Sequence, residues 1–280
     1  MASQMKWFNG SVRRLACLVS IAFFSVTASA QQPPAQAPRS ARESARVDLT
    51  GYWVSLVTED WIYREVTPPK GDYTAVPLNA EGRKAADTWD LVKDDAAGEQ
   101  CKPFGAAGLM RVPTRVHITW ADDNTLKVET DAGEQTRLFH FSKMPLPATE
   151  RTWQGSSIAE WMTQQGPPPA FGGGGGRGRG RGARGPEAPP HGSLKVMTKN
   201  LRAGYLRKNG VPYSANTVLT EYYDRIPAFS NDYIVITTVV EDPAYLQAPF
   251  ITTTHFKKEP SGAKWDPSPC RTDPPGRKGL

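Results

Sequence analysis

Seven side chains on predicted strands could carry acid–base or ligand-binding chemistry. Leu219, Glu221 and Tyr223 alternate along one strand-like run and therefore share one face of it. A carboxylate on the inner face of a sheet would be buried, and burial demands a partner or raises its pKa. Arg137 and Arg115 are the natural partners for Glu221. Such a pair could stabilise an interior, anchor a ligand, or leave Glu221 as a general acid or base.

A second group of candidates lies on the predicted strand 135–141. Leu138 and His140 share one face of it, and Arg137 shares the other with Phe139. His140 is therefore the second catalytic candidate beside Glu221. The residues predicted to contact a ligand are Arg115, Trp120, Arg137, Tyr222 and Tyr223.

Three of the four histidines could form a zinc site. His117, His140 and His255 each lie in a predicted strand, and three imidazoles are a known zinc ligand set. Each is followed by an apolar residue that points the opposite way, so some of these rings should face solvent. We therefore predict neither a metal nor another cofactor. Fingerprints of nucleophilic serine, phosphate-loop or dinucleotide chemistry do not occur in the sequence.

The strands that would position these residues are predicted from alternation and turn residues. Two three-strand meanders stand out in the sequence: 115–120, 125–130 and 135–141, then 216–225, 232–241 and 250–257. Further strands are predicted at 48–57, 61–66, 152–162 and 192–199. These ten strands favour an all-β fold, an antiparallel barrel that is closed or nearly closed, with a two-sheet sandwich as the alternative.

Little helix is expected outside this barrel. Residues 78–90 predict one short helix with Asn79 as its N-cap. The acidic stretch 90–100 and the stretch 201–214 are predicted as loops. The glycine- and proline-rich stretch 101–113 is predicted as an ordered loop packed on the barrel.

The first thirty residues have the composition of a secretory signal peptide. A basic start is followed by the short apolar run 15–24 and by the small residues Ala28 to Ala30, which predict cleavage after Ala30. The apolar run is too short to span a membrane. We expect a periplasmic or secreted protein without a transmembrane segment in the mature chain. Residues 31–46 are predicted as a disordered tether and 271–280 as a disordered tail, with the barrel domain at 47–270.

The positive charge of the chain does not indicate a nucleic-acid partner. The formal net charge is +6, of which three belong to the signal peptide and four to arginines of one glycine-rich segment, which leaves −1 for the rest. That segment lies within a predicted low-complexity loop insert at 166–191. A glycine-rich tract is tolerated at a hairpin tip because the entropy of loop closure grows slowly with length.

Two cysteines remain after signal cleavage. Cys101 and Cys270 would lie in a compartment that permits disulfides, so we expect them to be paired.

Two resemblances add to this interpretation. Gly51-x-Trp53 resembles the motif that opens the lipocalins, in which the tryptophan closes one end of the barrel; the resemblance implies structural roles for Gly51 and Trp53. From Cys101 onward the chain also resembles a set of uncharacterised secreted bacterial proteins. The matching stretches are Cys101-x-Pro-x-Gly, Leu109-Met-Arg-x-Pro113, Thr152-Trp-Gln-Gly-x-Ser-Ile, Gly210-Val-Pro-Tyr-Ser-Ala, Thr220-Glu-Tyr222 and Val240-Glu-Asp-Pro243.

Three functions follow from the sequence as hypotheses. The first is a secreted lipocalin-like barrel that binds a small hydrophobic or aromatic molecule in its lumen. The second is an enzyme of the isomerase, cyclase or dehydratase type that uses an acid or base in the same lumen. The third is an envelope interaction module that makes contact through its arginine–glycine loop.

Overall fold

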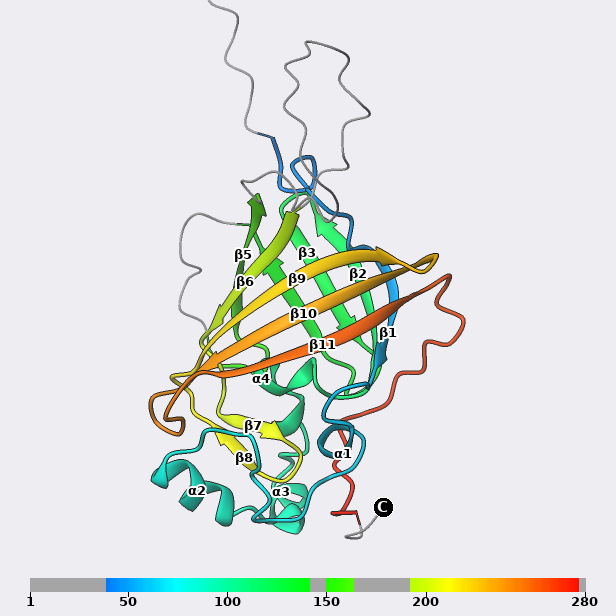
Figure 1. Cartoon of the computed structure of the whole chain (residues 1–280). Coiled ribbons are helices and arrows are strands. Elements are labelled where there is room, and N and C mark those ends of the chain that lie inside the picture. The colour runs from blue at the N-terminus through cyan, green and yellow to red at the C-terminus, as the bar shows by residue number, and fades with distance from the viewer. Residues whose placement is uncertain (1–38, 142–149, 164–191, 277–280) are drawn as a thin grey trace, which may run out of the picture. The chain divides into compact units, whose positions relative to one another are not determined.

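Nine β-strands form a closed barrel in the computed structural model of this chain (Figure 1). The structure describes residues 39–141, 150–163 and 192–276. In order around the barrel, the strands are β1 (Gly51–Leu56), β11 (Phe250–Glu259), β10 (Asn231–Glu241), β9 (Val218–Ala228), β6 (Gly192–Lys199), β5 (Ser156–Thr163), β4 (Thr136–His140), β3 (Thr125–Thr130) and β2 (Arg115–Asp122). Pairing of β1 with both β11 and β2 closes the ring, so the barrel is confirmed over the sandwich.

One pairing in the barrel is parallel. β4 and β5 share only two paired positions, Phe139 with Ser157 and His140 with Ile158. β4 and β5 both begin at the same end of the barrel. Just before β5, the backbone oxygen of Trp153 accepts a hydrogen bond from the N–H of Ala106, which holds the chain at that end. β5 then continues past the end of β4, and from Ala159 onward it pairs with β6 alone. Among the described residues, the last part of β5 therefore has one paired neighbour, β6.

Helices and a small sheet gather at one end of the barrel, and we call this region the helical cap (Figure 1). Its elements are α1 (Trp61–Arg64), α2 (Ala80–Asp87), α3 (Leu91–Ala96), the 3₁₀ helix η1 (Lys102–Phe104), α4 (Ala106–Leu109), β7 (Gly204–Arg207) and β8 (Val211–Tyr213). The cap shares a second apolar core with the ends of β9, β10 and β11, where Leu219, Val240 and Phe250 are buried. We call the other end of the barrel the lip.

Several cap elements differ from the sequence predictions. Residues 61–66 do not form a strand, because the side chain of Arg64 reaches the backbone oxygen of Arg111 and fixes a helical turn. The acidic stretch 90–100 contains α3, whose first backbone N–H groups are capped by Asp90. The stretch 201–214 contains the β7–β8 hairpin, which turns at Gly210 with a φ of 81°. The predicted helix is confirmed as α2, with Asn79 accepting from Gly82.

Ordered structure also extends beyond the predicted ends of the domain. Residues 39–46 form turns at the lip, and Ala41 is buried there with its N–H bonded to Asn124. Near the other end, Thr272 is buried and Gly276 bonds to Thr67. The predicted tether and tail are therefore wrong for these residues. The predicted signal peptide and loop insert lie outside the described residues, whereas the strands that flank the insert pair as an antiparallel hairpin, as predicted.

The predicted disulfide joins Cys101 to Cys270. Cys101 precedes η1 in the cap, and Cys270 lies in the segment that follows β11. The bond thus holds the C-terminal segment against the cap and the β3–β4 turn, where Gly133 and Ser268 are hydrogen bonded.

Candidate functional site

A buried ion pair occupies the interior of the barrel. Nη1 and Nη2 of Arg137 donate to Oε1 and Oε2 of Glu221 at 2.9 and 2.5 Å, and neither side chain has exposed surface. Two guanidinium nitrogens facing two carboxylate oxygens make the strongest form of this contact. The prediction that Arg137 is a partner of Glu221 is therefore confirmed.

Other polar side chains complete this pair. Tyr223 donates to Glu221 at 3.3 Å, and Arg137 donates to Thr198, which contacts Ser157 at 2.8 Å. Burial opposes the charge on Arg137, but the carboxylate of Glu221 outweighs it and raises the pKa of the guanidinium. Burial, followed by the charge of Glu221, raises the pKa of the Tyr223 hydroxyl. Arg137 thus stays charged inside the barrel.

Side chains fill the rest of the interior. The apolar residues that surround the ion pair are each 3% exposed or less: Val116, Ile118, Leu126, Val128, Phe139, Leu194, Val196, Ile234, Ile236 and Phe256. These side chains pack against one another in one apolar core and have little accessible surface. Arg137 and Tyr223, which were predicted to contact a ligand, are both buried in this interior and bonded to Glu221.

The two catalytic candidates do not meet. Glu221 points into the barrel. The ring of His140 lies on the outer face of β4, where it contacts Thr125 of β3 at 3.3 Å. Strand alternation separates them, as it separates Tyr223 inside from Tyr222 outside. The two candidates therefore lie on opposite faces of the barrel wall and do not share one site in this structure.

The histidines are also dispersed. His117 stacks on Tyr52 with ring centroids 4.0 Å apart, and His255 contacts Glu59 at 3.2 Å. Within the described ranges, no group of three His, Cys, Asp or Glu side chains could hold a metal ion. The zinc hypothesis is not supported by the placement of these three rings.

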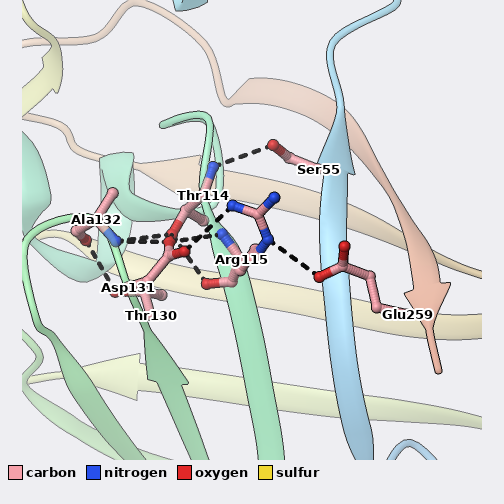
Figure 2. Close-up of polar contacts among 7 residues, drawn as sticks. All are labelled: Ser55, Thr114, Arg115, Thr130, Asp131, Ala132 and Glu259. Atoms are coloured by element: carbon pink, nitrogen blue, oxygen red, sulfur yellow. Dashed lines mark hydrogen bonds and ion pairs between the residues drawn. The ribbon is translucent and has the colours of Figure 1, made fainter. Parts of the chain in front are cut away.

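Arg115 belongs to a structural network at the start of β2 (Figure 2). Its guanidinium contacts Glu259 at 3.1 Å and Asp131 at 3.6 Å. One oxygen of Asp131 accepts from the backbone N–H groups of Arg115 and Ala132, and Thr114 contacts it at 2.8 Å. The network joins β2, the β3–β4 turn and β11. Arg115, which was predicted to contact a ligand, therefore has a structural role in this network.

A groove with a largely apolar lining lies at the lip. Its volume is about 660 Å³. It lies beside the part of β5 that extends past its paired positions with β4. We call it the lip groove; it is lined by Arg39, Ala41, Asn124, Phe141, Ile158, Ala159, Glu160, Trp161, Lys195 and Met197.

Two aromatic rings, Phe141 and Trp161, line the lip groove, and the ring of Trp120 packs against both. Phe141 lies 5.2 Å from Trp161 and 5.7 Å from Trp120, centroid to centroid. The indole of Trp161 is fixed by donation to the backbone oxygen of Ala41 at 2.8 Å. A second hollow of about 480 Å³ lies on the other side of Trp161, between residues 42–50 and Trp120. Of the predicted ligand contacts, Trp120 alone belongs to this region.

Charged groups lie at the rim of the groove. Lys195 donates to Glu160 at 2.8 Å, and this hydrogen bond raises the pKa of the ammonium group. The side chain of Asn124 is engaged with Ala41. An apolar molecule in the groove would therefore lie between aromatic side chains and a rim that carries charges of both signs.

Sequence analysis missed most of these groove residues. Ile158 and Met197 face outward on β5 and β6 and pair directly with each other. The alternation of Ser157, Ala159 and Trp161 does predict that Trp161 faces inward. What could not be predicted is the short parallel pairing with β4, which ends at His140 and Ile158.

Comparisons with known proteins give no assignment. No family model, no curated protein and no solved structure matches the chain. Among residues 39–141, 150–163 and 192–276, no helix has the length and apolar character needed to cross a membrane.

Proposed function

We propose that this barrel binds a small hydrophobic or aromatic molecule in the lip groove. The observation that carries the proposal is that the packed rings of Phe141 and Trp161 line this groove beside β5. Ligand sites are concave and largely apolar, with a few polar groups, and the groove volume falls in their usual range of roughly 300–1,000 Å³. The proposal moves the expected binding site from the lumen to the lip.

The start of β1 supports a lipocalin-like barrel as part of this proposal. Trp53 is fully buried, and its indole donates to the backbone oxygen of Leu49 at 2.9 Å. The ammonium group of Lys258 lies over its ring at 4.3 Å and donates to the backbone oxygen of Thr50. These contacts are consistent with the structural roles that the resemblance implies for Gly51 and Trp53.

The disulfide supports export as the setting for this function. Disulfides persist in oxidising compartments such as the periplasm or the extracellular space. The pair Cys101–Cys270 therefore agrees with the signal peptide predicted at residues 1–30.

Two matched methionine substitutions test the site. Met197 and Met162 are exposed to similar extents on the outer face of the β5–β6 hairpin, but only Met197 lines the groove. Met197→Glu places a carboxylate in the apolar lining and should weaken binding of the neutral fluorophore N-phenyl-1-naphthylamine about tenfold or more. Met162→Glu should leave binding unchanged. If both variants bind the fluorophore with the same affinity as the parent protein, the groove is not the binding site.

The enzymatic hypothesis receives less support from this geometry. Both oxygens of Glu221 are occupied by Arg137, and the side chain has no exposed surface from which to reach a substrate. General acid–base catalysis needs a group within hydrogen-bond reach of the reacting atom.

A further inference from the structure

Three arginines lie together in the helical cap, at the end of the barrel opposite the lip groove. Arg64 ends α1, Arg111 follows α4, and Arg207 ends β7. All three side chains are buried, with 2, 6 and 4% of each residue exposed. Buried arginines are rare unless a partner compensates their charge and satisfies their N–H groups.

Arg64 contacts Arg111 directly, and Arg207 joins them through Tyr63 and through its electrostatic interaction with Arg111. Nε of Arg64 donates to the backbone oxygen of Arg111 at 2.9 Å. The guanidinium of Arg207 lies 4.3 Å above the ring of Tyr63, the residue next to Arg64. The guanidinium of Arg111 lies 5.8 Å from the ring centre of Phe250.

The protein satisfies only part of this cluster. Glu59 pairs with Arg64, and Asp60 pairs with Arg111 at 3.0 Å. Within the part of the chain that the structure describes, the three side-chain nitrogens of Arg207 have no hydrogen-bond partner, and one nitrogen of Arg64 and one of Arg111 are likewise buried and unpartnered. Three positive charges therefore face two paired carboxylates, and five buried donor atoms remain unmatched.

The electrostatic environment of Arg207 agrees with this imbalance. Burial, and next the positive charge of Arg111, lower the pKa of Arg207 to about 10, against attraction from Asp60 and Asp72. Burial lowers the pKa of Arg64 as well. An additional negative charge at this position would relieve the repulsion and accept the unmatched N–H groups.

We propose that Arg64, Arg111 and Arg207 form a binding site for a phosphate-class oxyanion. One guanidinium fork matches one planar carboxylate, whereas donors on three guanidinium groups suit a tetrahedral anion with more acceptor oxygens. Asp60 is 42% exposed at its side chain, so the cluster borders solvent on the side of α1. This site is separate from the lip groove, and neither depends on the other.

Thermal shift and calorimetry on the folded, disulfide-bonded protein test the site with inorganic phosphate. At a phosphate concentration ten times the Kd, the melting temperature should rise by about 3 to 6 °C above that in chloride of equal ionic strength. Arg207→Met should abolish this rise. The control Arg271→Met removes an arginine whose side chain is 81% exposed, and it should keep the rise.

Each other outcome counts against the proposal. A phosphate effect no larger than that of chloride, or one equal in all three proteins, would mean that water satisfies these donors. A stronger response to acetate than to phosphate or sulfate would contradict the tetrahedral class. If Arg207→Met does not fold, calorimetric titration of the parent protein and of Arg207→Lys decides the question, with no heat of binding in the parent overturning the proposal. Phenyl phosphate then distinguishes free phosphate from a phosphate ester as the ligand.

Discussion

At the scale of single residues, the Arg137–Glu221 pair is the contact on which the barrel interior depends most. Both side chains are fully buried, so removing one partner leaves an uncompensated charge in the core. Glu221→Gln should therefore lower the free energy of unfolding by about 3 to 5 kcal/mol, measured by urea denaturation. The double variant Arg137→Met/Glu221→Leu should recover most of that loss. A loss below about 1 kcal/mol for the single variant would contradict the role of this pair.

Asp48 gives a residue-scale prediction that depends on pH. Burial tends to raise its pKa, but hydrogen bonds from Thr50, with the charges of Lys258 and Arg225, lower it overall. A carboxyl group with a lowered pKa in the folded state stabilises the protein above its unfolded value of 3.8, and this contribution disappears as the pH falls through the folded pKa.

Asp48→Asn should therefore destabilise the protein only where the carboxylate is charged. At pH 7 we expect a loss of about 0.5 to 1 kcal/mol, because the group is partly solvated. Near pH 2 the variant and the parent should unfold at the same denaturant concentration. Urea denaturation at both pH values measures this difference, and an equal loss at both would show that the charge of Asp48 is not the cause.

At the scale of elements, alternation in the sequence predicted the strands themselves better than it predicted where they end or which strands they pair with. Both meanders are present, and β9, β10 and β11 pair in sequence as expected. The predicted turn at 226–231 is shorter in the structure, since β9 continues through Pro227 to the left-handed residues Phe229 and Ser230. Local sequence gives the period of a strand, but tertiary pairing decides how far it extends.

The cap was predicted less well because contacts distant in sequence stabilise it. Arg64 turns residues 61–64 into a helix by reaching Arg111, and Tyr205 of β7 donates to Asp94 of α3. Neither contact leaves a periodic pattern. The same reason explains the candidate sites: Glu221 and Arg137 could be paired from strand faces, whereas the lip groove arises from the β4–β5 contact that no motif signals.

The disulfide provides an element-scale prediction. It closes a sequence separation of 169 residues and holds the C-terminal segment to the cap. The double variant Cys101→Ser/Cys270→Ser should lose about 2 to 5 kcal/mol of unfolding free energy. In this variant, hydrogen exchange should become faster than in the parent protein in residues 268–276, where Ser268 bonds to Asp131. The increase should be larger there than in β10. Unchanged exchange in that segment would show that its hydrogen bonds suffice without the disulfide.

At the scale of the whole molecule, the barrel is a filled scaffold with distinct features at its two ends. Its interior is packed around an ion pair, its lip carries an aromatic groove, and its cap carries the arginine cluster. A sealed interior means that small molecules can be bound without opening the fold. The stability of the protein and its affinity for apolar molecules should then vary independently in variants at the lip.

The measurement that tests this account most directly is a ¹⁵N–¹H correlation spectrum of the indole groups during titration with N-phenyl-1-naphthylamine. Seven tryptophans follow residue 30, each with one indole signal, so the barrel, lip and cap are sampled together. We predict that the signals of Trp120 and Trp161 shift and saturate, while those of Trp89 in the cap and Trp53 in the core stay in place. Shifts concentrated on Trp53 would place the ligand inside the barrel and contradict a sealed interior with its binding site at the lip.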